Sequence, residues 1–144
     1  MEMIIFTGIP ASGKSSFYKE LFFNSHLRIS MDLLNTRNKE NRLLQYCFET
    51  QSRMVIDNTN VTRESRKKYI EPAKQNQYEI IGYFFDSSVP DCLERNRNRK
   101  DTINEIGIKA KYKELQKPTF EEGFDKIFTV KIVNNTFEIS PYEI

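Results

Sequence analysis

The stretch Gly8-Ile9-Pro10-Ala11-Ser12-Gly13-Lys14-Ser15 decides how the rest of the chain is interpreted. It matches the phosphate-loop pattern G-x-x-x-x-G-K-[ST] at every fixed position. The apolar run 3–6 before it predicts a buried strand, and apolar residues at helical spacing follow it as far as residues 21 and 22. The pattern therefore lies between a strand and a helix, which is the context that a phosphate loop requires.

The residue types in this loop suit the binding of a phosphate chain. Gly8 and Gly13 let the backbone curl so that successive N–H groups form an anion-binding nest, and the helix starting near Gly13 adds its positive N-terminal end. Lys14 can reach the β- and γ-phosphates, and the Ser15 hydroxyl can ligate Mg²⁺. An ordinary glycine-containing turn is the alternative that this context disfavours. The predicted nucleotide-binding residues are Gly8, Ile9, Pro10, Ala11, Ser12, Gly13, Lys14, Ser15 and Ser16.

Composition predicts one globular, soluble domain over residues 1–144, large enough for its own core. Charged residues make up 29% of the chain and hydrophobic residues 38%, and the net charge of +2 is too small to indicate nucleic-acid binding by itself. No apolar run approaches membrane-spanning length, and the first strand starts too early for a signal peptide. We therefore expect a cytoplasmic protein with no membrane partner and no evident need for a protein partner.

Cysteine and histidine usage limits the chemistry. Cys47 and Cys92 lie far apart without C-x-x-C spacing, so we expect two core thiols in a reducing compartment. His26 is the single histidine, which excludes a histidine-rich metal site. A single histidine also disfavours a histidine-based catalytic triad.

The hydrophobic pattern predicts strands that alternate with helices. The expected strands are 3–7, 27–30, 53–57, 78–85 and 126–133, with a hairpin at Asn134-Asn135 returning through 136–139. Helices are expected after the phosphate loop to about residue 23, after the polar stretch 35–41, from about Arg63 with a kink or interruption at Pro72, and behind capping boxes at 88–91 and 102–105. Ile108, Tyr112 and Leu115 are the expected buried stripe of the last helix.

This alternation predicts an α/β fold: a P-loop NTPase three-layer α/β/α sandwich with a mostly parallel sheet and a C-terminal antiparallel hairpin. Ligands of such sheets bind beyond the carboxyl ends of the strands. The phosphate loop, Asp32 and Asp57 all follow strands, so three separate segments are expected at one edge of the sheet.

Two aspartates are candidates for chemistry at this edge. Asp32 could accept the proton of an attacking hydroxyl, although a helix N-cap or turn is an equally simple use for it. Asp57 ends a strand where P-loop proteins often place an acid that holds metal-bound water, and an Asx-turn is its alternative. No glutamate follows Asp57, so the acid pair of motor ATPases is missing and hydrolysis is the less attractive purpose.

Basic residues supply the remaining candidates. On a helix, Arg95 and Arg99 would be i and i+4 and would present two guanidinium groups to a polyphosphate as a lid. A solvated basic face is the alternative. A second basic surface for nucleic-acid phosphates, or again only solvated helix faces, could form from Lys109, Lys111, Lys113, Lys117, Arg63, Arg66, Lys67 and Lys68.

The segments GIPASGKS, RISMD, VIDNTN, CLERNRNR and PTFEEGFD occur in the order and spacing of polynucleotide kinase-like P-loop kinases, which the chain resembles over nearly its whole length. The resemblance implies transfer of the ATP γ-phosphate to a 5′-hydroxyl of DNA or RNA, with ATP and Mg²⁺ bound. It implies that Asp32 is the general base, that Ser15 and Asp57 serve the metal, and that Lys14, Arg95 and Arg99 act on the phosphates.

The acceptor side departs from that family in two places. Met31 stands where members acting on polynucleotides often have arginine before the catalytic aspartate, and Arg37 is the nearest candidate for a contact with the acceptor's phosphate, at a longer offset than expected. Three functions therefore stay open: a polynucleotide 5′-hydroxyl kinase, a kinase of a small molecule such as a nucleoside, sugar derivative or antibiotic, and an ATP-binding module without transfer.

Overall fold

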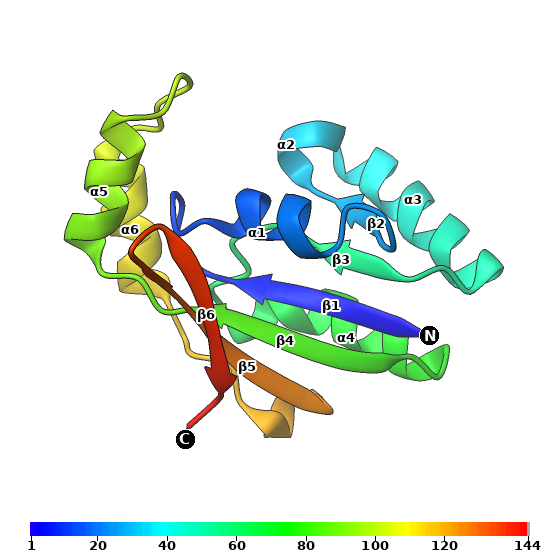
Figure 1. Cartoon of the computed structure of the whole chain (residues 1–144). Coiled ribbons are helices and arrows are strands. Elements are labelled where there is room, and N and C mark those ends of the chain that lie inside the picture. Colours follow the sequence, from blue (N-terminus) through cyan, green and yellow to red (C-terminus); the bar gives the residue numbers. More distant parts are fainter. Residues whose placement is uncertain (144) are drawn as a thin grey trace.

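A computed structural model describes residues 1–143, in which six strands form one sheet in the order β2-β3-β1-β4-β5-β6 (Figure 1). The strands are β1 (Glu2–Thr7), β2 (Leu27–Ile29), β3 (Met54–Ile56), β4 (Glu79–Phe85), β5 (Lys126–Val133) and β6 (Thr136–Pro141). All neighbouring pairs are parallel except β5 and β6, which are antiparallel. The predicted mostly parallel sheet with a C-terminal hairpin is therefore confirmed.

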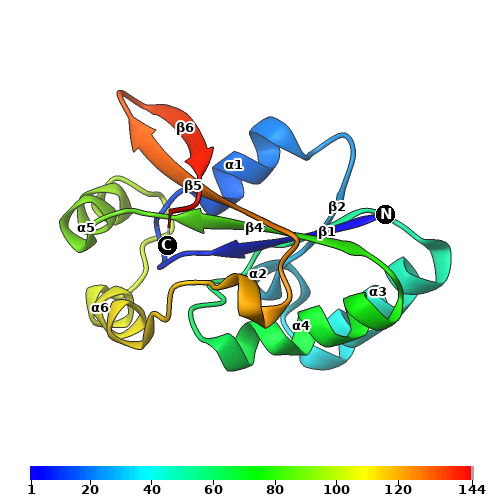
Figure 2. The ribbon, with the colours of Figure 1, turned by 90° about the horizontal axis from the view of Figure 1, so that it is seen from below.

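Helices cover both faces of this sheet. They are α1 (Lys14–Leu21), α2 (Met31–Leu34), α3 (Arg37–Thr50), α4 (Arg63–Gln75), α5 (Val89–Arg97) and α6 (Glu105–Glu114), with a short 3₁₀ helix η1 (Phe120–Glu122). Figure 2 shows α1 on one face, α3 and α4 on the other, and α5 beside α6 at one end of the sheet. The predicted three-layer sandwich is confirmed.

The period-two alternation of β1 divides the core into two layers. Ile4 and Phe6 face α1 and pack with Phe17, whereas Met3 and Ile5 face the opposite way, toward α3 and α4. Each of these five side chains is at most 1% exposed, so β1 is apolar on both faces as expected of a central parallel strand. Its carboxyl end carries the phosphate loop to the edge of the sheet.

The start of α3 differs from the prediction. The expected polar loop at 35–41 ends at Thr36, whose Oγ1 accepts a hydrogen bond from the Lys39 N–H and caps a helix that begins at Arg37. The one-turn helix α2 lies before it and carries Asp32 in its first turn. The predicted loop is wrong because the cap at Thr36 was not recognised, and Arg37 lies on a helix.

Three other helix predictions need correction. α5 ends at Arg97 with Asn98 as its C-cap, so Arg99 is in the following loop and not on the same helix face as Arg95. Asn104, not Thr102, caps α6, and Tyr112 is 48% exposed, outside the buried stripe that includes Ile108.

The expected interruption at Pro72 is also wrong, because α4 continues to Gln75. The backbone N–H and side-chain amide of Asn76 both donate to the Pro72 carbonyl, at 3.1 and 2.8 Å, and close the helix end just beyond the proline. These two bonds satisfy the Pro72 carbonyl, one of the last carbonyls of α4 that have no partner within the helix.

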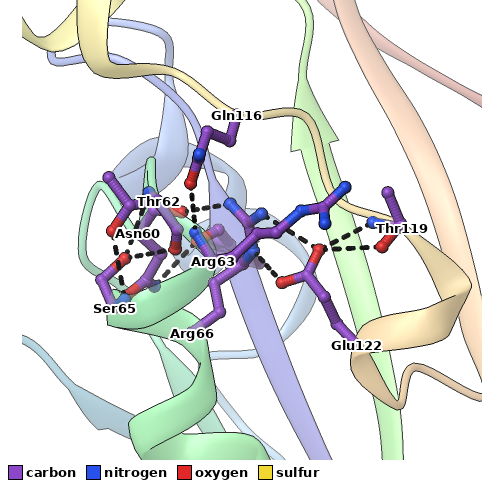
Figure 3. A network of polar contacts seen from close by, with 9 residues as sticks. Asn60, Thr62, Arg63, Ser65, Arg66, Gln116, Thr119 and Glu122 are labelled. Carbon is purple, nitrogen blue, oxygen red and sulfur yellow. Dashed lines mark hydrogen bonds and ion pairs between the residues drawn. The ribbon is translucent and has the colours of Figure 1, made fainter.

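A buried polar network holds the loop between β3 and α4 (Figure 3). The fully buried guanidinium of Arg66 donates to both carboxylate oxygens of Glu122, at 2.7 and 3.0 Å, and to the Asn60 carbonyl at 2.8 Å. Glu122 also accepts the Thr119 N–H at 2.8 Å. The network therefore ties the VIDNTN segment to the PTFEEGFD segment, and Arg66 is not part of a solvated basic surface.

The two cysteines are free and buried, as predicted. None of the helices between residues 1 and 143 is long and apolar enough to cross a lipid bilayer.

Candidate active site

Both glycines of the phosphate loop are sterically required. Gly13 has a φ of 98°, in the left-handed region, and a Cβ there would lie 2.9 Å from Ile132 Cδ1. A Cβ on Gly8 would lie 2.7 Å from Ser12 Oγ and 2.8 Å from the Phe85 Cβ. The loop can therefore take its curled form only with glycine at these two positions, and α1 starts directly after it at Lys14.

The Lys14 ammonium is buried within the loop. Its Nζ donates to the carbonyls of Gly8 and Ile9, both at 2.9 Å, and lies 3.4 Å from Ser12 Oγ. Burial lowers the pKa of Lys14 to about 8, although the Asp57 and Asp32 carboxylates act in the opposite direction. The lysine is therefore a positive charge with little solvent around it.

Ser15 and Asp57 come together at the carboxyl edge of the sheet. The Ser15 hydroxyl donates to Asp57 Oδ2 at 3.1 Å, and that carboxylate is 2% exposed. Arg28 of β2, which the sequence analysis did not single out, donates from Nε to the same oxygen at 2.8 Å and from Nη2 to Ser15 Oγ at 3.1 Å. A charged residue inside a short, otherwise apolar strand was the available signal for Arg28.

A cavity of about 580 Å³ opens over this edge. It is lined by the predicted site residues Pro10, Ala11, Gly13, Lys14, Ser15, Ser16, Asp32, Arg37, Asp57, Arg95 and Arg99. The other predicted residues are Gly8, Ile9 and Ser12. Ile9 is buried in a core cluster and Ser12 is 1% exposed, so these side chains stabilise the loop and do not line the cavity. The cavity also has lining residues that the prediction missed: Lys19, Met31, Asn58, Thr59 and Ile103.

Arg95 and Arg99 reach the cavity from different elements. Arg95 Nη1 donates to the Ala11 carbonyl at 3.1 Å and thereby fixes α5 against the phosphate loop. The loop with Arg99 is closed by Asn96, whose amide exchanges two hydrogen bonds with the Ile103 backbone, at 2.6 and 2.8 Å. The two arginines therefore converge through this closed loop and not through i, i+4 spacing.

Arg37 lines the same cavity while bound to a buried carboxylate. Its Nη1 donates to Glu40 Oε1 at 2.9 Å, and Glu40 is completely buried. Burial alone would raise the pKa of Glu40, but hydrogen bonds from Lys68, Tyr69 and Arg37 outweigh it and keep that pKa below its ordinary value. Glu40 is therefore a carboxylate at neutral pH, and nothing in the sequence pattern of α3 distinguished it from a solvated helix residue.

Known proteins support this picture of the fold and the motifs. A family model described as an AAA domain matches residues 27–121. The chain belongs to the AAA domain family. The match covers more than half of the chain and starts after the phosphate loop, so the loop and the family match are independent observations.

Two curated relatives of this AAA domain confirm the predicted resemblance to polynucleotide kinases. A bifunctional polynucleotide phosphatase/kinase of Schizosaccharomyces pombe is 30% identical over 88% of this chain and 32% of its own length. A putative bifunctional polynucleotide phosphatase/kinase of Acanthamoeba polyphaga mimivirus is 33% identical over 90% of this chain and 33% of its own. The chain thus spans about a third of the length of these relatives.

A solved structure shares the fold of this AAA domain. The gluconokinase of Sinorhizobium meliloti 1021 superposes with a TM-score of 0.66 and 17% identity, over 92% of this chain and 83% of the gluconokinase. At that identity the likeness concerns the arrangement of strands and helices.

Proposed function

We propose that this protein is an ATP-dependent phosphotransferase that phosphorylates the 5′-hydroxyl of a polynucleotide. The observation that carries the proposal is the shared cavity, in which Asp32 lines the same space as Lys14, Ser15, Arg95 and Arg99. A carboxylate beside a phosphate loop suits activation of a hydroxyl. The names of the two curated relatives support a polynucleotide acceptor.

In the proposed step the Asp32 carboxylate accepts the proton of the acceptor hydroxyl. The hydroxyl oxygen forms a bond to the γ-phosphorus, and the bond from that phosphorus to the β–γ bridging oxygen breaks, so that ADP leaves with the electron pair. Lys14 and the N–H groups of the loop hold the phosphates, and Arg95 and Arg99 stabilise the negative charge of the transition state. Each role belongs to a group that lines the cavity or forms its loop.

The residues at Ser15 and Asp57 fit a magnesium ion. Hydroxyl and carboxylate oxygens are the ligands that Mg²⁺ prefers, and the 3.1 Å between Ser15 Oγ and Asp57 Oδ2 is close to the separation of adjacent oxygen ligands in an octahedral shell. When bound, the ion would neutralise phosphate charge. Between residues 1 and 143 no group of three His, Cys, Asp or Glu could hold a metal, so phosphates and water would supply the other ligands, and Arg28 would share Asp57 with the ion.

A small-molecule acceptor is the second candidate. The ion pair between Arg37 and Glu40 favours it, because a guanidinium already balanced by a carboxylate attracts an acceptor phosphate less strongly. Met31 and Ile103 further add apolar surface to the cavity. ATP binding without transfer is disfavoured by the placement of Asp32, which would then have no task in the cavity.

The test is transfer of labelled phosphate from γ-labelled ATP to a 5′-hydroxyl oligonucleotide, in parallel with nucleosides and sugars. We expect a labelled oligonucleotide, and we expect Asp32→Asn to lower the transfer rate about 100-fold or more while the affinity for an ATP analogue stays unchanged. Asp91→Asn, an exposed aspartate in the first turn of α5, is the control.

Labelling of a small molecule with no labelled oligonucleotide would establish the second candidate. ATP turnover that persists in the Asp32→Asn variant without any labelled acceptor would instead indicate a nucleotide-binding module.

A further inference from the structure

The buried carboxylate of Glu40 is surrounded by four polar side chains from three segments of the chain: α3, the loop after β3, and α4. It accepts hydrogen bonds from Lys68 Nζ at 2.6 Å, the Tyr69 hydroxyl at 2.8 Å and Arg37 Nη1 at 2.9 Å, and it lies 3.4 Å from Asn58 Nδ2. A fully buried carboxylate is costly for a fold, because it gives up its hydration. An apolar residue would fill the same position of α3, so the charge points to a role other than stability.

The charge of Glu40 sets the direction of a chain of hydrogen bonds. A carboxylate only accepts, so the Tyr69 hydroxyl must donate to it, and burial raises the pKa of Tyr69 to about 12, which keeps that proton in place. The hydroxyl oxygen is then free to accept from Asn58 Nδ2 at 3.1 Å. Because the Asn58 NH₂ group donates to Tyr69, the Asn58 side-chain oxygen must point away from Tyr69.

That oxygen meets the start of the helix that carries Asp32. Asn58 Oδ1 accepts the Met31 N–H at 2.9 Å, the first backbone donor of α2. α2 has four residues, and its own N-cap residue Ser30 makes no side-chain capping bond. A helix this short is unstable alone and leaves its first N–H groups without partners, so Asn58 caps it from a distant loop.

We propose that Glu40 is a positioning residue that, through Tyr69 and Asn58, fixes the start of α2 and thereby the Asp32 carboxylate. The same carboxylate holds the Arg37 guanidinium at the cavity, so one buried charge places both groups on the acceptor side. The inference rests on the proposed function, in which Asp32 receives the acceptor's proton. It predicts that loss of Glu40 disturbs acceptor turnover and leaves the phosphate loop intact.

Amide hydrogen exchange at Met31, followed by NMR, tests the geometry without any activity. We expect Glu40→Gln, Tyr69→Phe and Asn58→Ala each to speed exchange of the Met31 N–H about five- to ten-fold, the effect of one lost hydrogen bond. Glu49→Gln is the matched control, because Glu49 lies on the same helix, is exposed and accepts only from Gln45. Unchanged exchange in a folded Tyr69→Phe variant, which keeps its ring, would overturn the proposal.

Kinetics then separate positioning from a general loss of fold. In Glu40→Gln we expect kcat/KM for the acceptor to fall by up to about 100-fold, the cost of a reacting group misplaced by about 1 Å, while the affinity for an ATP analogue changes less than two-fold. The isosteric Asn58→Asp should be as harmful as Asn58→Ala, because a second carboxylate cannot donate to Tyr69. A tolerated Asn58→Asp, or equal losses of nucleotide and acceptor binding, would refute the positioning role.

The two proposals fail in different ways. If the wild-type protein phosphorylates no acceptor, the proposed function is wrong, and the exchange at Met31 still decides whether Glu40 controls α2. If the wild type is active and Met31 exchange is insensitive to Glu40, Tyr69 and Asn58, the function stands and the positioning role is wrong.

Discussion

The two sides of the cavity are built in different ways. On the phosphate side, Lys14 is bound by Gly8, Ile9 and Ser12, no more than six residues away. On the acceptor side, Met31 is held by Asn58, 27 residues away, and Glu40 binds Tyr69, 29 residues away. The lysine of the phosphate loop is thus held by its own motif, whereas the acceptor side is held by segments that meet only in the folded chain. Under the proposed function, substitutions on the acceptor side can therefore change the acceptor while the phosphate loop stays the same.

The largest effect is expected from removing the buried network that holds the loop after β3, which belongs to the acceptor side. Arg66→Met leaves the Glu122 carboxylate buried without its partner and frees the Asn60 carbonyl. We expect a loss of about 3–5 kcal/mol in the free energy of unfolding, measured by urea denaturation. The next residue supplies the control: Lys67→Met, whose side chain is 69% exposed, should stay within about 0.5 kcal/mol of wild type. Equal stabilities would mean that the network in Figure 3 is dispensable.

The second prediction concerns the arginines that cover the phosphate side. Arg99→Ala should lower kcat about 100-fold with little change in ATP affinity, because its guanidinium is expected to meet charge that develops in the transition state. Arg97→Ala is matched to it, since Arg97 lies two residues earlier and pairs with Glu105 on the surface. A turnover number that is unchanged in Arg99→Ala would support the alternative interpretation, in which Arg99 is a solvated surface residue without a role in catalysis.

The smallest expected effect is the uptake of a proton when nucleotide binds. With its pKa near 8, Lys14 has lost much of its charge above that pH, and a bound triphosphate would raise the pKa again. When an ATP analogue binds at about pH 8.5, Lys14 should therefore take up part of a proton, whereas near pH 7 it is already protonated and should take up none. The affinity for the analogue should accordingly weaken as the pH rises through 8. Calorimetry in two buffers of different ionisation enthalpy measures this uptake, and Lys14→Met should abolish it. Uptake that persists in Lys14→Met would assign the proton to another group.

The same contrast explains what the sequence could predict. The phosphate loop, the alternation of strands and helices and the Asn134-Asn135 hairpin depend on local residue types. The two asparagines do adopt the positive φ of 52° and 61° that such a turn needs. Asp32 and Asp57 were expected at one edge because parallel strands end together. Glu40 could not be found in this way, because its partners Lys68 and Tyr69 are known only after the chain has folded, whereas Arg28 is marked only by its charge within an apolar strand.

Helix boundaries were the least predictable local feature. Thr36 and Asn104 cap α3 and α6, but serine, threonine and asparagine are common throughout this chain, so the pattern offered competing caps. The end of α5 at Arg97 separated Arg95 from Arg99, yet both reach the cavity because Asn96 closes the intervening loop. Arg95 and Arg99 thus lie at the same cavity, as predicted, but tertiary contacts bring them together and helical spacing does not.

A Cβ on Gly13 would lie 2.9 Å from Ile132 Cδ1 and 3.1 Å from Phe137 Cε1, so the β5–β6 hairpin lies close against the phosphate loop. In the sequence, more than 100 residues separate this loop from the hairpin that packs against it. A variant chain that lacks β6 should consequently hold nucleotide poorly. Nucleotide capture then depends on the far edge of the sheet, although the residues that bind the phosphates lie in one short stretch.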